Sequence, residues 1–239
     1  MKFKPMRKLL SMAVLAIFTL SMAQAQTADE VISKYVSAIG GAAKWKAVKS
    51  QKSDITVNQM GMDLNGVITG DDKNRQRLEI EFQGMKMIQA YDGTTAWGIN
   101  GFMGQTSASK LPEAEADAMK KTEFLDEMID YKKRGFTATL EGEETIEGTA
   151  CYVVKMTKKD GSEKMHYFDK ETGLKTAEME MVNGQELLTV MEEYEEQDGL
   201  VSPSKITQKS GGAVVVSITI NNTERNIAVT DDLFAYPGN

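Results

Sequence analysis

The spacing of hydrophobic residues changes along this chain, from a helical period near the start to a strand period beyond Lys52. Thr27 and Glu30 have the spacing of a capping box, so the first helix should begin there. Its apolar stripe recurs every three to four residues and consists of Val31, Ile32, Tyr35, Val36 and Ile39. Gly40-Gly41 should end this helix, and a short second helical turn should follow around Trp45.

Beyond Lys52 apolar and polar residues alternate, which is typical of half-buried strands. The run 77–82 is the clearest case, Met85 and Met87 continue one side of the next strand, and Asp92-Gly93 predicts a hairpin before 94–99. Further strands are expected at 136–146, 151–157, 164–168, 174–181, 186–193, 204–209 and 214–221. In the last, one face should carry Val214, Val216, Ile218 and Ile220. Glycine-containing turns separate these runs at intervals of roughly ten residues, which predicts an antiparallel meander.

A helix interrupts the meander between Pro112 and about Tyr131. Acidic residues follow Pro112 and basic residues precede Gly135, which suits the two ends of a helix. Its predicted apolar face comprises Met119, Phe124, Leu125, Met128 and Ile129. The fold class we expect is therefore mainly β with α: one domain over 26–239, in which helices cover the concave face of a curled antiparallel sheet.

The first 25 residues are organised like a secretory signal peptide. Lys2, Lys4, Arg7 and Lys8 precede an apolar run over 9–20, and Ala23-Gln24-Ala25 is a cleavage pattern. This run is shorter than the roughly 20 residues that a spanning helix needs. We expect a soluble, exported chain that begins at Gln26, with an uncleaved amphipathic anchor as the alternative.

Charge excludes several classes of partner. The signal segment holds four of the 28 lysines and arginines and none of the 35 acidic residues, which leaves the exported chain with a net charge of −11. That negative charge argues against nucleic acid and against anionic membrane surfaces as partners. The acidic run 192–196 is accordingly interpreted as a solvated strand edge.

The chain has little of the chemistry that catalysis or metal binding requires. Cys151 is its only cysteine, so no intramolecular disulfide can form, and we expect a buried apolar role for it. His166 is likewise the only histidine. These counts exclude cysteine clusters and histidine-rich zinc sites and leave little for a hydrolytic triad, so we expect no cofactor, no metal and no catalytic residue.

Methionines are the most distinctive candidates for binding. Several lie two residues apart, namely Met60/Met62, Met85/Met87 and Met179/Met181, so each pair points to one face of a strand. A methionine-lined concave face can receive irregular apolar ligands such as acyl chains. Core packing and capture of copper(I) are the alternatives. Phe102 and Met103 lie between glycines in an apolar loop that can rim a cavity or pack beneath the helix.

Four segments, in order along the chain, resemble the LolA-like periplasmic carriers that sort outer-membrane lipoproteins. They are 81–93 (EFQGMKMIQAYDG) followed by Trp97, 167–173 (YFDKETG), 198–203 (DGLVSP) and 231–237 (DDLFAYP). The resemblance implies an incomplete antiparallel β-barrel whose helical lid encloses an apolar cavity for acyl chains. Family members often carry an arginine that holds the lid; here the register gives Asp71-Asp72-Lys73, with Arg75 and Arg77 the nearest arginines.

The expected function is a non-enzymatic periplasmic carrier of lipoproteins or related lipids, served by an inner-membrane donor and an outer-membrane acceptor. The alternative is an envelope sensor of the same fold that signals to a protein partner; a hydrolase would rest only on scattered acids and His166. The predicted cavity and lid residues are Leu78, Ile80, Phe82, Met85, Met87, Trp97, Phe102, Met103, Phe124, Leu125, Met128, Met179 and Met181.

Overall fold

The structure, a computed structural model, describes residues 26–182 and 184–238; the predicted signal segment 1–25 lies outside the described residues. Helices are α1 (Ala28–Ala38), α2 (Ala42–Ala47), α3 (Glu113–Lys121) and the 3-10 turns η1 (Gly101–Met103) and η2 (Asp231–Leu233). Strands are β1 (Ser50–Gln59), β2 (Met62–Asp71), β3 (Gln76–Phe82), β4 (Met85–Tyr91), β5 (Ala96–Asn100), β6 (Ser109–Lys110), β7 (Thr137–Ile146), β8 (Thr149–Thr157), β9 (Glu163–Asp169), β10 (Lys175–Val182), β11 (Gln185–Gln197), β12 (Leu200–Ser210) and β13 (Ala213–Arg225). No helix among the described residues is long and apolar enough to cross a membrane.

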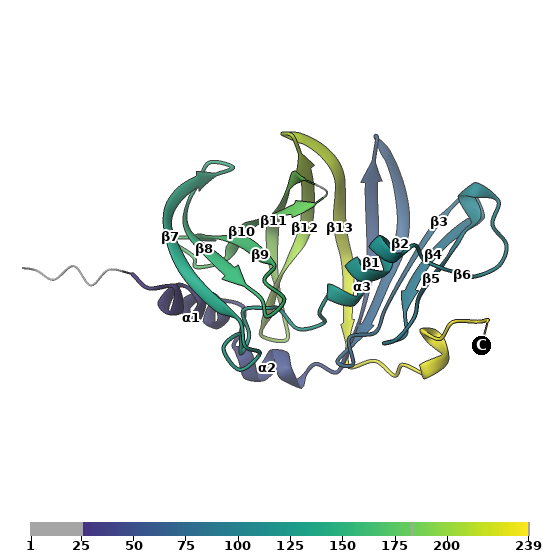
Figure 1. The fold of residues 1–239 in the computed structure, drawn as a ribbon, viewed down its shortest axis with the longest axis horizontal. Coiled ribbons are helices and arrows are strands. Elements are labelled where there is room, and N and C mark those ends of the chain that lie inside the picture. Colours follow the sequence, from purple (N-terminus) through teal and green to yellow (C-terminus); the bar gives the residue numbers. More distant parts are fainter. Residues whose placement is uncertain (1–25, 183, 239) are drawn as a thin grey trace, which may run out of the picture.

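The strands form one antiparallel sheet of 13 strands in which nearly every strand pairs with its neighbour in sequence (Figure 1). The exception is the consecutive pair β6 and β7, which lie at opposite edges of the sheet; instead, β1 also pairs with β13 and so joins the two halves of the chain along the middle of the sheet. The strands β6 and β7 remain as edges, so the sheet does not close into a barrel. The predicted antiparallel sheet with helices is thus confirmed, while the β1–β13 pairing had no signal in the local pattern.

Helix α1 forms for the reasons that its sequence indicates. The Thr27 hydroxyl accepts a hydrogen bond from the Glu30 amide, and the Glu30 carboxylate accepts one from the Thr27 amide at 2.8 Å. This capping box satisfies two amides that the first turn leaves without helical partners. The apolar stripe, including Val31, Ile32 and Tyr35, is buried against the sheet.

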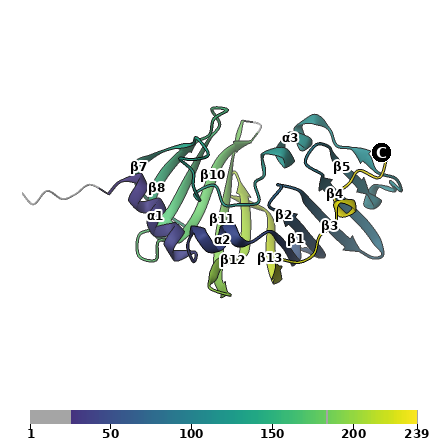
Figure 2. The same ribbon diagram turned by 90° about the horizontal axis from the view of Figure 1, so that it is seen from below.

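The two faces of the sheet differ in what covers them. The face on which α1 packs is the helix-covered face; on β8 it carries Val154 and Met156, which are buried with Phe168 of β9. The opposite face carries a second buried cluster, made of Cys151, Val153, Tyr167 and Ala177. Figure 2 shows α1 over the β7–β8 side of the sheet, whereas α3 lies toward β4 and β5.

The predicted helix over 112–131 is wrong beyond Lys121. Helix α3 ends there, and the chain continues through turns over 122–135, which we call the connecting segment. Thr122 is extended, the Asp126 carboxylate accepts a hydrogen bond from the Met128 amide, and Asp130 has a φ of 54°, which a helix does not permit. Burial of Met128 and Ile129 in the α1 core stabilises this irregular path over continued helix.

The predicted face of β13 also needs correction. A β-bulge places Val214 opposite Lys209 but Val216 opposite Gln208. Neighbouring residues of β12 point to opposite faces, so Val214 lies on the face opposite to Val216 and Ile218.

Candidate functional site

A row of apolar side chains crosses the helix-covered face in the middle of the sheet. Its members lie directly opposite one another on five adjacent strands and are Met191, Ile206, Ile218, Val57 and Leu64. Each of the five is half-buried, in contrast to the fully buried side chains beneath α1. We call this row the apolar strip. The apolar strip is a hydrophobic surface that the rest of the protein covers only in part.

The strip has a closely packed floor on its β1–β3 side. Ile55, two residues before Val57 on β1, and Ile80 of β3 both pair with Gly66 of β2. Their side chains are 2% and 3% exposed and meet above this glycine. A Cβ atom on Gly66 would lie 2.6 Å from Ile80 Cδ1, so only glycine lets the two isoleucines close over β2. Phe82 and Met85, which pair at the end of β3 and β4, extend the apolar surface sideways.

Two covers flank the strip and leave it open between them. On one side α1 and the connecting segment bury β8 and β9. On the other, the carbonyl of Met119 in α3 accepts a hydrogen bond from Gln76 Nε2 at 2.7 Å. Phe124 lies beside Gly70, and the two help to line a cavity of about 170 Å³ together with Ile68.

Of the residues predicted from sequence to line the cavity, one group lies on the helix-covered face of β3 and β4: Leu78, Ile80, Phe82, Met85 and Met87. Those predicted to form the lid, Phe124, Leu125 and Met128, belong to the connecting segment instead of a helix. Leu125 and Met128 pack into the α1 core, and Met128 is 1% exposed, so these two are core residues.

The structure separates the remaining predicted residues from the strip. Trp97 lies on the opposite face, where its Nε1 donates a hydrogen bond to the carbonyl of Phe234 at 2.8 Å. Met179 packs on the Cys151 cluster of that same face, and Met181 beyond it is exposed. Phe102 and Met103 of η1 protrude at the end of the sheet. Sequence alternation alone cannot assign faces across strands whose register shifts at bulges.

A buried ion cluster, which sequence reasoning missed, lies beneath the connecting segment; it comprises Asp126, Glu127, Lys164, His166, Lys175 and Glu178. His166 is fully buried, with Nε2 3.2 Å from a Glu127 oxygen and Nδ1 3.6 Å from a Glu178 oxygen. Lys175 Nζ lies 3.2 Å from an Asp126 oxygen and 3.4 Å from a Glu178 oxygen. The only sign of this cluster in the sequence is that Lys164 and His166 lie two residues apart and so point to the same face of a strand.

Charge pairing sets the protonation of this cluster. Burial by itself would raise the pKa of Glu178, but the charges of Lys175, Lys164 and His166 lower it to about 2. Burial likewise opposes ionisation of Glu127, yet its close approach to His166 and the nearby charges hold its pKa well below the ordinary value. Burial lowers the pKa of His166 despite these carboxylates.

Three residues of the cluster also have the composition of a metal site. One donor atom each from Glu127, His166 and Glu178 lies within 4.8 Å of the others. However, Lys158 Nζ is 3.0 Å from a Glu127 oxygen and Lys164 Nζ is 3.1 Å from a Glu178 oxygen. Because these ammonium groups already neutralise the carboxylates, the donor set does not favour a divalent cation. The cluster fastens the connecting segment to β9 and β10.

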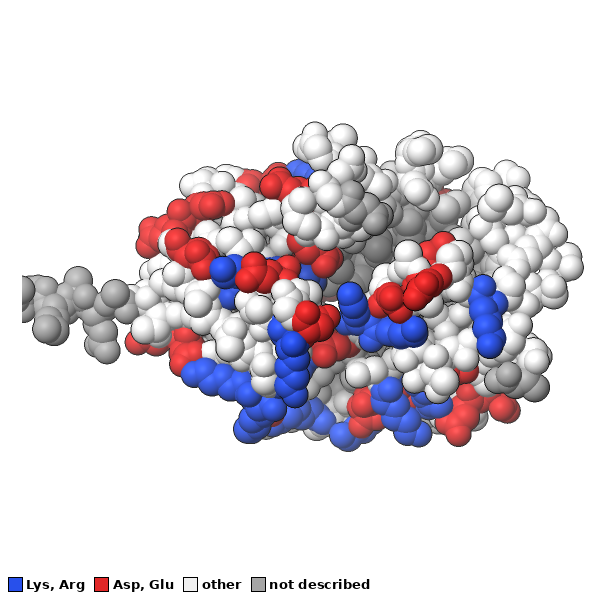
Figure 3. All heavy atoms as spheres, in the orientation of Figure 1, with Lys and Arg blue, Asp and Glu red and all other residues white. Residues whose placement is uncertain are grey.

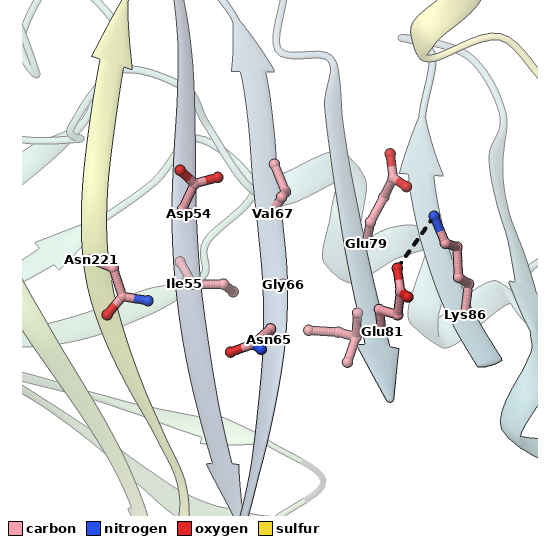
Figure 4. A pocket seen from close by; sticks show the side chains of 10 residues that line it. Asp54, Ile55, Asn65, Gly66, Val67, Glu79, Glu81, Lys86 and Asn221 are labelled. Carbon is pink, nitrogen blue, oxygen red and sulfur yellow. Dashed lines mark ion pairs between the residues drawn. The ribbon is translucent and has the colours of Figure 1, made fainter. Parts of the chain in front are cut away.

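A hollow of about 350 Å³ lies over β1–β4, and by strand alternation its polar side chains belong to the opposite face (Figure 4). They include Asp54, Asn65, Glu79, Glu81 and Lys86. Lys86 Nζ is 3.4 Å from a Glu81 oxygen, and Arg77 donates to Glu79 at 2.7 Å, so these charges are paired within the protein. A polar wall of this kind does not suit an acyl chain.

In LolA-like carriers an arginine often holds the lid, and the arginines nearest to that position are Arg75 and Arg77. Both contact the C-terminal segment, residues 231–234, instead. Arg75 is buried, lies 2.6 Å from both an Asp71 and an Asp231 oxygen, and stacks over Phe234. Arg77 donates to the Leu233 carbonyl at 3.1 Å. Neither arginine touches the connecting segment through a hydrogen bond or ion pair among the described residues.

No family model and no curated protein matches this sequence. Solved structures do match. A DUF1329 family protein from Desulfovibrio piger shares 14% identity at a TM-score of 0.58, over 88% of this chain and 98% of that chain. A LolA superfamily protein from Nitrosomonas europaea shares 13% at 0.57, over 88% and 98%.

A putative outer membrane lipoprotein-sorting protein domain from Vibrio parahaemolyticus shares 7% identity at a TM-score of 0.55, over 85% of this chain and 97% of that chain. The chain has a LolA-like fold. The fold predicted from the four resembling segments is therefore confirmed. At these identities the likeness concerns the LolA-like architecture alone, so function must be argued from the strip.

Proposed function

We propose that this protein binds acyl chains of lipoproteins or related lipids on the apolar strip and carries them through the periplasm without catalysis. The observation that carries the proposal is the half-exposed row over β11, β12, β13, β1 and β2. Contiguous apolar surface of this kind on a soluble protein marks a binding site, because each buried CH₂ group contributes about 0.8 kcal/mol.

The surroundings of the strip support binding over chemistry. The ion cluster is enclosed beneath the connecting segment and paired internally, and Cys151 is fully buried on the opposite face. The strip itself presents no titratable side chain. The lipoprotein-sorting name of the Vibrio structure fits this use of the fold, and a signal peptide at 1–25 would deliver the chain to the periplasm.

A matched pair of variants on β13 tests the proposal. Ile218→Glu places a carboxylate on the strip, whereas Thr219→Glu places one on the opposite, exposed side of the same strand. We expect Ile218→Glu to weaken binding of a fluorescent fatty acid at least about tenfold, since ligand burial must then desolvate a charge. Thr219→Glu should bind like the wild type.

Thermal melts of both variants complete the test. Because the strip is half-exposed, both variants should remain folded and melt close to each other. Equal binding by Ile218→Glu and wild type would refute the strip as the acyl site. Mass spectrometry of lipids co-purified from the periplasm should also recover acyl-bearing species with the wild type.

A further inference from the structure

The exposed apolar side chains of this protein gather at one end of the sheet. The described part of the chain has ten exposed large apolar residues. Nine of them lie in turns or at strand ends: Met60, Met62, Met85, Phe102, Met103, Met181, Val182, Val214 and Val215. Successive turns of a meander alternate between the two ends, so the turns β1–β2, β3–β4, β10–β11 and β12–β13 share one end with the charged β8–β9 turn, Lys158 to Asp160. Gly101 of η1 lies against Lys86 and joins them.

The tips β1–β2, β3–β4, β10–β11 and β12–β13 together with η1, which we call the apolar rim, carry little charge, and Lys209 beside the β12–β13 tip is paired with Glu147 at 2.8 Å. The stretches 59–62, 82–85, 100–109 and 210–223 contain no acidic or basic residue. The turns at the other end, by contrast, carry charges at Asp71 to Arg75, Asp92, Lys170-Glu171 and Asp198. Figure 3 shows uncharged side chains over the tips of β12–β13 and β1–β2 at the top, while charged side chains lie toward the bottom and at the upper left.

We propose that the apolar rim inserts into the interface of a lipid bilayer. Neighbouring tips are two strands apart, roughly 10 Å, so the apolar side chains stand as separate points along the rim. A bilayer accepts separate insertions at one level, whereas a protein groove needs contiguous contact. Methionine suits this contact because its flexible side chain adapts to disordered lipid. Met60 and Met103, 92% and 83% exposed, are the most exposed of these side chains.

Charge identifies the kind of bilayer. The exported chain is strongly acidic, so an anionic surface would repel it, and the two lysines beside the rim, Lys86 and Lys209, are already paired with Glu81 and Glu147. Binding should therefore be apolar in origin, favour zwitterionic lipid and persist in high salt, because salt screens charges but does not weaken apolar burial.

The rim adjoins the proposed acyl site, and on this point the inference rests on the proposed function. Leu64 of the strip is two residues from Met62, and Val57 is three residues from Met60. An acyl chain leaving a bilayer at the rim would thus enter the strip without crossing water.

Vesicle co-sedimentation tests the inference. We expect wild-type protein to sediment with phosphatidylcholine vesicles, and Met60→Asp/Met103→Asp to lose roughly tenfold or more of that affinity. Both positions are highly exposed, so the double variant should fold normally, as its melting temperature would verify. Thr94→Asp, in an exposed turn at the charged end, is the matched control and should sediment like the wild type.

Two further arms separate this inference from the proposed function. The double variant should still bind a fluorescent fatty acid in solution, and Ile218→Glu should lose the fatty acid but still sediment with vesicles. Equal sedimentation of wild type and double variant, no sedimentation of wild type, or sedimentation that requires phosphatidylglycerol would each overturn the inference. Concentration-dependent self-association that the double variant abolishes would overturn it in favour of a second copy of this chain.

Discussion

The helix-covered face of the one sheet contains two apolar regions that differ in how they are covered. Over β8 and β9, α1 and the connecting segment bury Val154, Met156 and Phe168 completely and enclose the ion cluster. Over β11 to β2, the strip of similar apolar residues stays half-exposed. In the first, closed region the apolar side chains are buried when the protein folds. In the second, open region part of the apolar surface remains accessible to a ligand. The two regions have similar residues, so what distinguishes the core from the proposed binding site is whether a helix or the connecting segment covers them.

Paired truncations should expose this difference most strongly. Phe168→Ala opens a cavity in the closed region and should reduce the free energy of unfolding by about 3–5 kcal/mol. Leu64→Ala, in the strip, should cost only about 1 kcal/mol because its side chain is already partly in water. Chemical denaturation measures both. Similar losses at the two sites would show that the strip is packed as tightly as the core.

Breaking the ion cluster should have an effect of similar or slightly smaller size. Lys175→Met leaves the carboxylates of Asp126 and Glu178 buried without this ammonium group and should cost about 3–5 kcal/mol. Lys52→Met is the surface control, because its ion pairs lie at 3.7 Å and 3.9 Å on exposed side chains, and it should change stability by less than about 1 kcal/mol. Urea titrations that rank the two variants equally would contradict a stabilising role for the cluster.

Acid should weaken the closed region while leaving the strip unchanged. The pKa of His166 is lowered in the fold, so below its ordinary value of 6.5 the unfolded chain takes up a proton that the folded chain resists, and stability falls. Glu178, with its pKa lowered to about 2 from 4.5, adds a loss as pH falls through that range.

Unfolding free energies from pH 7 to pH 4 should therefore decrease, and His166→Gln should flatten the slope below pH 6.5. Affinity for the neutral dye N-phenyl-1-naphthylamine should stay constant wherever the fold persists, because no strip residue titrates. Dye affinity that follows the His166 titration would instead couple the two regions.

The smallest effect concerns the edge of the closed region. Thr27→Ala removes the capping hydroxyl of α1 and should cost about 1 kcal/mol, while Thr27→Ser should restore most of it. Dye binding should not change in either variant. A melt of Thr27→Ala that matches the wild type would show that α1 is held by packing alone.

Local patterns predicted what is local in this fold. The capping box, the alternation on β3 and the glycine turns depend on residues close in sequence, and each is confirmed. The β1–β13 pairing joins segments more than 150 residues apart, and no short pattern specifies it. That pairing aligns Val57 with Ile218, so the strip was beyond sequence reasoning.

The errors also have physical causes. The apolar residues after Lys121 follow a helical spacing, yet burial of Met128 and Ile129 against α1 stabilises turns instead. Bulges invert the alternation from one strand segment to the next, which moved Val214 to the opposite face. Trp97 was predicted to line the cavity, but its side chain lies on the opposite face and donates a hydrogen bond to the carbonyl of Phe234.

Photolabelling with a diazirine fatty acid, followed by peptide mass spectrometry, tests the central claim most directly. If the open region is the acyl site, labels should fall on the strip residues of β11, β12, β13, β1 and β2, above all Met191, Ile206, Ile218, Val57 and Leu64. Excess unlabelled fatty acid should suppress them. Labels concentrated on β8–β9 or on the polar hollow of Asp54 and Glu79 would contradict the division between a closed core and an open site.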